Sequence, residues 1–217
     1  MTREEILSTT VAFVKQQLAE TESGHNWFHI ERVWRNTKLI AANEPVDLLV
    51  AELGALLHDI ADSKFHQGDE TIGPATAALF LKGLPVDETM ATHVVNIVKH
   101  ISFKGGNEEQ VFSSPELAVV QDADRLDAIG AIGIARAFHY GGFKNREIYD
   151  PAVLPNLEMT KEEYKNSQAP TINHFYEKLL LLKERMNTAT GKKIAEARHR
   201  FMEDYLQQFY GEWNGEC

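Results

Sequence analysis

The chain has almost no cysteine: among its 217 residues the one thiol is Cys217. An internal disulfide is therefore impossible, and a reducing cytoplasm is the expected location. The sequence also lacks any run of about 18 apolar residues, so we expect no membrane-spanning helix. The first residues lead into an amphipathic segment without the apolar region of a signal peptide, so we expect no secretion signal.

Basic residues are in the minority. The chain has 22 lysines and arginines against 32 aspartates and glutamates, a net charge of −10. Such a surface repels long nucleic acid, which is therefore not an expected partner. A nucleotide is still a reasonable substrate, because a few local lysines and arginines are enough to hold phosphates. Oligomeric state leaves no mark on the sequence.

Apolar residues recur at helical spacing and no convincing strand alternation occurs, which predicts an all-α fold. The length suits one domain over residues 1–217. The segment 46–60 is apolar almost all round, as expected of a helix in the middle of a bundle. The composition of residues 140–160 predicts one long loop, and loops of this length are usually functional or mobile. Helices are expected over residues 3–21, 26–43, 46–60, 73–83, 87–102, 115–139, 170–186 and 190–209.

The most informative pattern is His58-Asp59, which follows the apolar helix. A neighbouring imidazole and carboxylate are costly to bury unless something compensates them, and a bound metal ion compensates both. His29 lies upstream as a further candidate ligand, with Arg32 on the same side of its helix. Imidazole and carboxylate are ligands shared by several divalent metals. The pattern favours a metal-dependent hydrolase over a pair that merely caps a helix.

A second acidic group lies in the segment Gln121-Asp122-Ala123-Asp124-Arg125-Leu126-Asp127, which is flanked by apolar residues. Carboxylates near a helical core need a cation to offset their desolvation. Asp122 and Asp124 are both candidate ligands, and Arg125 could reach a phosphate. For Asp127, a salt bridge within the protein is as good an interpretation as a functional role.

Four blocks of sequence carry a family resemblance: Gly24–Val33, Leu56–His66, Val98–Phe103 and Gln121–Gly130. Together they resemble the HD-domain superfamily of metal-dependent phosphohydrolases, and most of all its small bacterial stand-alone members. The resemblance implies a single helical bundle with the metal site between core helices. The motif-bearing core spans about residues 24–146, and C-terminal helices over about 170–210 complete the bundle.

The resemblance also implies roles for individual residues. His29, His58, Asp59 and Asp124 would ligate the metal, with Asp124 preferred over Asp122 because the family's ligand directly precedes a basic residue. Many relatives have aspartate where this chain has Asn26, a change that could alter the support of a ligand histidine. Manganese is the favoured ion, with magnesium, iron, nickel, cobalt and zinc as alternatives.

Relatives mostly hydrolyse phosphate esters or anhydrides, and similar small proteins resemble nucleotide pyrophosphohydrolases. A divalent ion can polarise a phosphoryl oxygen and acidify its bound water, which suits this chemistry. Asp62 is placed to orient that water as a base. The other predicted catalytic residues are Lys64, Arg125 and His100, and the predicted phosphate-binding residues are Arg32, Lys64, Lys99, Lys144 and Arg146.

The leading hypothesis is a hydrolase that splits a nucleoside triphosphate into monophosphate and pyrophosphate. Phosphomonoester or cyclic-nucleotide hydrolysis is an alternative within the same fold. A di-iron oxygenase would need more histidine ligands, which His93 or His100 could supply. A nucleotide-binding sensory module with a structural metal is the non-enzymatic alternative, and the intact ligand set argues against it.

Overall fold

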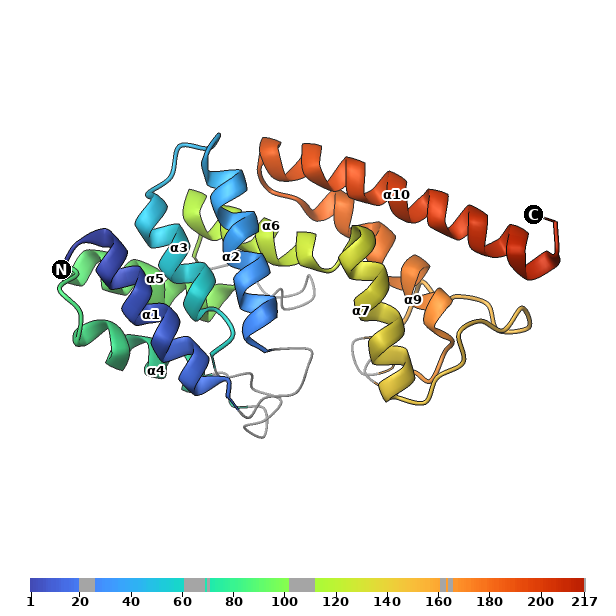
Figure 1. Ribbon diagram of the computed structural model, residues 1–217, viewed down its shortest axis with the longest axis horizontal. Helices are drawn as coiled ribbons and strands as arrows, with labels where there is room; N and C mark the ends of the chain where they lie inside the picture. Colours follow the sequence, from blue (N-terminus) through green and yellow to red (C-terminus); the bar gives the residue numbers. More distant parts are fainter. Residues whose placement is uncertain are drawn as a thin grey trace. The chain divides into compact units, whose positions relative to one another are not determined.

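The computed structural model describes residues 1–19, 26–60, 69, 71–101, 112–160, 163 and 166–216. In these residues every regular element is a helix, which confirms the predicted all-α class (Figure 1). None of the helices described has both the length and the apolar character needed to cross a membrane. The chain forms two compact units, Met1–Asp124 and Arg125–Cys217. One domain over residues 1–217 stays a prediction.

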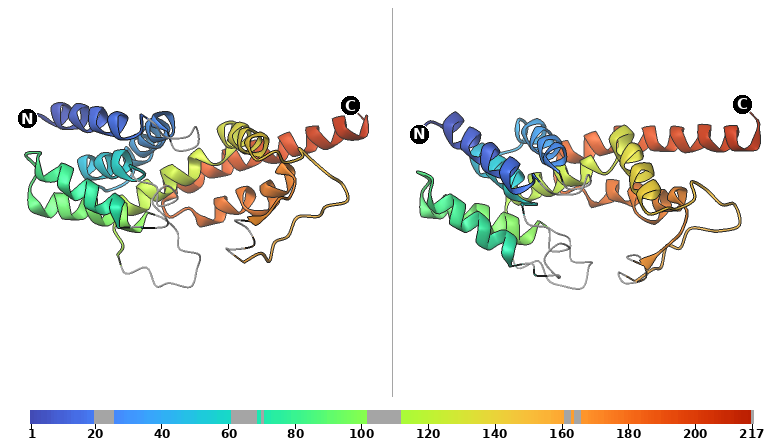
Figure 2. Two further views of the ribbon diagram at one scale, coloured as in Figure 1. Left: turned by 90° about the horizontal axis from the view of Figure 1, so that it is seen from below. Right: turned by 60° about the horizontal axis from the view of Figure 1, so that its bottom comes forward.

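The first unit is built around α3 (Leu48–Leu57), which packs against α1, α2 and α5, while α4 packs against α5 (Figures 1 and 2). Every residue from Val50 to Leu57 is buried, so α3 is enclosed on all sides as its composition predicted. The carboxylate of Asp47 begins the helix by accepting the N–H groups of Leu49 and Val50 at 2.9 and 3.2 Å. The surrounding helices are α1 (Arg3–Gln17), α2 (Trp27–Ala41), α4 (Ile72–Lys82), α5 (Glu88–His100) and most of α6 (Pro115–Asp127).

The second unit holds α7 (Gly130–Phe143), α9 (Thr171–Glu177), the 3-10 helix η2 (Leu179–Arg185) and α10 (Ala189–Asn214). The long helix α10 packs against α7 and η2, and α9 contacts η2 and α7. Aromatic rings fill the centre of this unit. The ring of Phe175, which is fully buried, lies 6.0 Å from the rings of both Phe138 and Tyr205, measured between centroids.

The prediction of one helix over residues 115–139 was wrong, because the chain breaks between α6 and α7. Ile129 is extended, with φ −127° and ψ 167°. Gly130 follows with φ 73°, a left-handed conformation that glycine adopts without steric cost. The segment predicted as one helix over 170–186 likewise divides into α9 and η2. Apolar spacing continues across both breaks, so it could not locate them.

A substitution at Gly133 would test how tightly the chain packs at the break between α6 and α7. A Cβ atom there would lie 2.2 Å from the backbone carbonyl oxygen of Ala128, which has no rotamer to escape into. Gly133→Ala should therefore lower the free energy of unfolding by about 1–3 kcal/mol in urea titrations. Gly142 in the same helix has nothing within 4 Å of its would-be Cβ. Gly142→Ala is the matched control, and should be neutral or stabilising by up to about 1 kcal/mol.

His174 of α9 predicts a dependence of stability on pH. Burial, followed by the positive charges of Lys178 and Arg146, lowers the pKa of this imidazole from 6.5 to about 4. The folded protein therefore holds the histidine neutral, whereas the unfolded chain protonates it below pH 6.5. This contribution is fully present above pH 6.5 and is lost as the pH falls toward 4. From pH 7 to 5, wild type should lose about 2 kcal/mol more than His174→Gln in urea unfolding; equal losses would contradict the assignment.

Candidate metal centre

The histidine of α2 and the His-Asp pair at the end of α3 converge in the first unit. One potential ligand atom from each of His29, His58 and Asp59 lies within 4.8 Å of the other two. The two imidazole rings meet edge to face, with centroids 5.4 Å apart. Because a divalent ion sits about 2.0–2.2 Å from nitrogen and oxygen ligands, it holds them roughly 3–4.4 Å from one another. The three side chains therefore fit one ion.

The orientation of His58 is set by its own helix. This residue follows Leu57, the last residue of α3, and its Nδ1 lies 2.8 Å from the carbonyl oxygen of Ala55. A carbonyl can only accept a hydrogen bond, so Nδ1 carries the proton and donates it. Nε2 is then the atom with a free lone pair for a metal. The buried helix thus determines which nitrogen of His58 is available to a metal.

The position of His29 depends on the cap at the start of α2. Asn26 Oδ1 accepts the backbone N–H groups of Phe28 and His29, at 3.1 and 3.3 Å. His29 therefore lies in the first turn, where its side chain is buried. Asparagine caps a helix as well as aspartate does, so the residue in which this chain departs from many relatives still holds the ligand helix in place.

Asp124 approaches the cluster from α6. Its Oδ1 lies 3.5 Å from His29 Nε2, a separation that suits two ligands of one ion. Asn36 of α2 donates to the carbonyl oxygen of Ala123 at 3.2 Å, which holds α6 beside α2 at this point. Asp122, the other candidate in the segment, is fully buried.

Asp127 belongs to the second unit and has a structural partner. Its Oδ2 accepts a hydrogen bond of 2.5 Å from Arg136 Nη1, which also donates to the Asp127 carbonyl oxygen at 3.2 Å. Arg198 donates to the neighbouring carbonyl of Leu126 at 2.5 Å. Of the two interpretations of Asp127, the salt bridge within the protein is the one that the structure supports.

The other predicted residues lie on several elements. His100 ends α5, where its backbone carbonyl oxygen accepts a hydrogen bond of 3.2 Å from Gln121. Lys99 beside it is exposed, and Arg32 on α2 is half-buried. Arg125 Nη1 donates to the carbonyl oxygen of Arg185 at 2.7 Å. Lys144 and Arg146 lie at the end of α7, while Asp62 and Lys64 fall outside the described residues.

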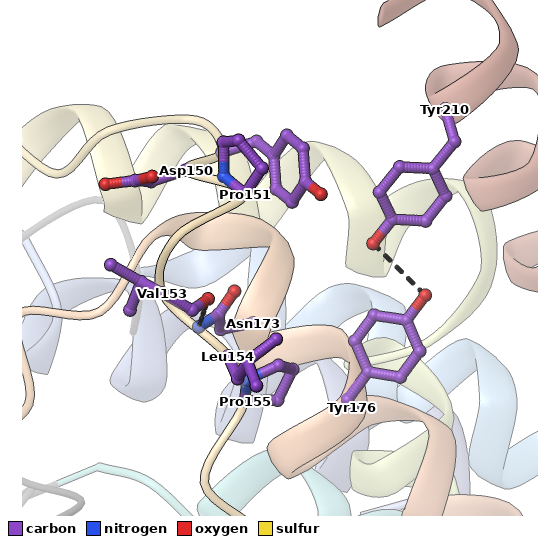
Figure 3. A pocket seen from close by; sticks show the side chains of 9 residues that line it. Asp150, Pro151, Val153, Leu154, Pro155, Asn173, Tyr176 and Tyr210 are labelled. Carbon is purple, nitrogen blue, oxygen red and sulfur yellow. Dashed lines mark hydrogen bonds between the residues drawn. The ribbon is translucent and has the colours of Figure 1, made fainter. Parts of the chain in front are cut away.

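A pocket in the second unit was not indicated by any sequence pattern (Figure 3). Its volume is about 240 Å³, and residues 149–155 together with α9 and α10 line it. The hydroxyl groups of Tyr176 and Tyr210 face one another at 3.2 Å. Burial, helped by this hydrogen bond, raises the pKa of Tyr210. Because the lining comes from segments far apart in the chain, sequence spacing could not reveal the pocket.

Comparison with known proteins places these observations in a family. Residues 26–129, which include the whole candidate cluster, match the model of the HD domain. The curated relative YpgQ of Bacillus subtilis, an uncharacterized protein, is 35% identical over 199 residues, which cover 90% of this chain and 88% of YpgQ.

Solved structures agree with the sequence match. An HD-superfamily hydrolase from Bacillus thuringiensis superposes with a TM-score of 0.80 and 41% identity, covering 98% of this chain and 99% of the hydrolase. The complex of Bacillus subtilis YpgQ with ADP has a TM-score of 0.76 and 33% identity, with coverage of 97% and 100%. This protein belongs to the HD-domain superfamily of metal-dependent phosphohydrolases.

Proposed function

We propose that this protein is a cytoplasmic, metal-dependent nucleotide hydrolase that splits a nucleoside triphosphate into a monophosphate and pyrophosphate. The observation that carries the proposal is the convergence of His29, His58 and Asp59 within 4.8 Å. Two imidazoles and a carboxylate, with Asp124 beside them, make a set of nitrogen and oxygen ligands for a divalent ion. Manganese is the ion that we propose, and His29, His58, Asp59 and Asp124 are the proposed ligands.

The proposed ligands provide more than affinity. When bound, a divalent ion supplies Lewis acidity, which lowers the barrier to attack of water on a phosphoryl group. The chain's own contribution is to hold the ligand atoms before substrate arrives: Asn26 fixes the first turn that carries His29, and the carbonyl of Ala55 orients His58. This preorganisation means that little reorganisation is needed during the reaction.

Support for a nucleotide comes from a relative. YpgQ, which is 33% identical to this chain in the structural comparison, has been crystallised in complex with ADP. In the proposed reaction water attacks the α-phosphorus, the bond from that phosphorus to the bridging oxygen breaks, and pyrophosphate leaves. Asp62 is proposed as the base that orients the water, with Lys64, Arg125 and His100 as further catalytic groups. The proposed phosphate contacts are Arg32, Lys64, Lys99, Lys144 and Arg146.

One observation weakens the oxygenase alternative. His93, one of the two histidines that could supply an additional iron ligand, has its Nε2 2.9 Å from Ser114 Oγ and 3.4 Å from Glu116 Oε2. Ser114 Oγ also accepts the backbone N–H of Leu117 at 3.0 Å. His93 therefore supports the beginning of α6 through Ser114, and these contacts are structural.

Product analysis tests the proposed reaction directly. We expect purified protein to convert a nucleoside triphosphate from a panel of bases into monophosphate and pyrophosphate when Mn²⁺ is added, and to stop when a chelator is present. Chromatography of the nucleotides and a phosphate assay identify the bond that is cut. Release of orthophosphate alone, or turnover of monophosphates or cyclic nucleotides only, would contradict the proposed bond.

The assignments of Asp59 as a ligand and Asp62 as the base predict different effects on metal content and on turnover. Asp59→Ala should remove both bound metal and activity, because it deletes one of three converging donors. Asp62→Ala should keep the metal but slow turnover by roughly 10²–10⁴-fold, the usual contribution of a general base. Metal content by mass spectrometry and turnover under saturating Mn²⁺ separate the two effects.

Asp204→Ala is the matched control for these variants, since Asp204 is an exposed carboxylate on α10. It should retain both metal and activity. Full activity in Asp62→Ala with metal in place would show that Asp62 is not the base. A normal metal content in Asp59→Ala would remove Asp59 from the ligand set.

A further inference from the structure

The pocket in the second unit is walled by a loop that α9 holds in place. Residues 149–155 form the loop, and Nδ2 of Asn173 donates to the carbonyl oxygen of Val153 at 3.0 Å. Just beyond the loop, the N–H of Asn156 donates to Glu177 Oε1 at 3.1 Å. Because both bonds come from α9, the wall is already in position before a ligand arrives, and binding need not order it.

The charge of the lining favours a neutral ligand. The nine lining residues that the structure describes include no lysine or arginine, and Asp150 is the charged residue among them. Asp150 Oδ1 accepts the N–H of Ala152 at 2.9 Å, and its carboxylate points away from the hydroxyl groups of Tyr176 and Tyr210 (Figure 3). A phosphate group would meet one carboxylate and no cation in this lining, so the pocket disfavours an anion.

Most of the lining is apolar, and much of it consists of rigid rings. The apolar and aromatic side chains of the loop that line the pocket are Tyr149, Pro151, Val153, Leu154 and Pro155. Leu154 lines the pocket and yet is 81% exposed. A ligand that covers such a side chain gains free energy from the apolar surface that it removes from water. Flat proline and tyrosine rings suit a planar ligand, because flat surfaces make close contact with one another.

The pocket also presents hydrogen-bonding groups. The hydroxyl groups of Tyr176 and Tyr210 meet at 3.2 Å (Figure 3). Two hydroxyl groups carry two hydrogens, and the bond between them uses one, so the pair retains one O–H donor together with its lone pairs. Asn173 uses one amide hydrogen on Val153, and retains a second hydrogen and its carbonyl oxygen. The pocket therefore offers both donors and acceptors inside an apolar enclosure.

The volume of the pocket limits the size of its ligand. About 240 Å³ is somewhat less than the roughly 300–1,000 Å³ of pockets that take drug-sized molecules. The pocket therefore suits one ring system and not a whole nucleotide. A ring that is neutral, planar and edged with donors and acceptors is a nucleobase. Asparagine complements such an edge well, because its amide offers a donor and an acceptor side by side.

We propose that this pocket binds a nucleobase. Asn173 and the hydroxyl pair of Tyr176 and Tyr210 supply hydrogen bonds to the edge of the base, and the apolar loop with Leu154 covers its face. The base belongs either to a separate nucleoside or to the nucleotide substrate, and only the second source rests on the proposed function. The phosphates of a bound nucleotide lie outside the pocket, since its lining offers them no cation among the described residues.

Calorimetric titration with nucleosides, which carry no phosphate, tests the pocket in the full chain. With chelator present, so that no metal contributes, at least one of adenosine, guanosine, cytidine and uridine should bind, whereas ribose should not. Tyr176→Phe should raise Kd for that nucleoside roughly threefold to tenfold, as expected for the loss of one hydrogen bond. Tyr205→Phe removes a hydroxyl group from the helix that carries Tyr210, but outside the lining, and should leave Kd unchanged.

Leu154→Ala covers the case in which Tyr176→Phe does not fold. Leu154 is largely exposed, so this variant should fold normally and raise Kd several-fold through the loss of apolar contact. Leu157→Ala is the matched control, since Leu157 is also exposed but does not line the pocket, and it should leave Kd unchanged. Absence of nucleoside binding by the wild-type protein overturns the site. So does an unchanged Kd in folded Tyr176→Phe and Leu154→Ala proteins.

Kinetics with metal distinguish the two sources of the base. If the pocket holds the base of the substrate, Leu154→Ala should raise KM for the nucleoside triphosphate several-fold. If it holds a separate nucleoside, added nucleoside should change the turnover of the wild-type protein, and Leu154→Ala should raise the concentration that is needed; either result supports the site. Nucleoside binding that depends on Leu154 in a protein without hydrolysis would overturn only the proposed reaction. Hydrolysis by a protein that binds no nucleoside would overturn only the site.

Discussion

The cost of bringing polar groups together at the end of a fully buried apolar helix is the constraint on which the candidate centre depends. Every residue of α3 from Val50 to Leu57 is buried, and His58 and Asp59 follow directly. His29 is buried and His58 and Asp59 are half-buried, so bringing these groups together removes part of their hydration, a cost that a cation accepting their lone pairs would offset. The converging ligand atoms form a cluster that could hold a metal ion, and an ion bound there would couple metal affinity to folding through the same helix.

The aspartates of α6 illustrate how one short segment serves both units. Asp124 turns toward His29 in the first unit, whereas Asp127, three residues on, pairs with Arg136 in the second. Both residues lie on the same side of a regular helix by spacing alone. What separates them is the partner that each meets: the imidazole of His29 in one case and the guanidinium of Arg136 in the other. Identical side chains thus have different roles because their neighbours differ in charge.

Charged side chains in the two units have different kinds of partner. The first buries Glu52, which accepts hydrogen bonds from Arg3 and from Trp34 Nε1, so that its carboxylate is balanced within the protein. The second keeps Lys144 and Arg146 on an aromatic ring without a carboxylate beside them among the described residues. Aromatic rings hold cations in position without neutralising them, and so preserve their attraction for an anionic ligand.

The sequence by itself determined the all-α class and the buried character of α3, because these follow from composition and from spacing along one helix. The set of candidate metal ligands came from the family resemblance of its motifs. Comparison with relatives confirmed the family. Tertiary structure alone decided that Asp127 pairs with Arg136, because this pair joins two helices across a break in the chain that the sequence did not show. The break at Gly130 was also hidden, since apolar periodicity persists while one left-handed residue redirects the chain.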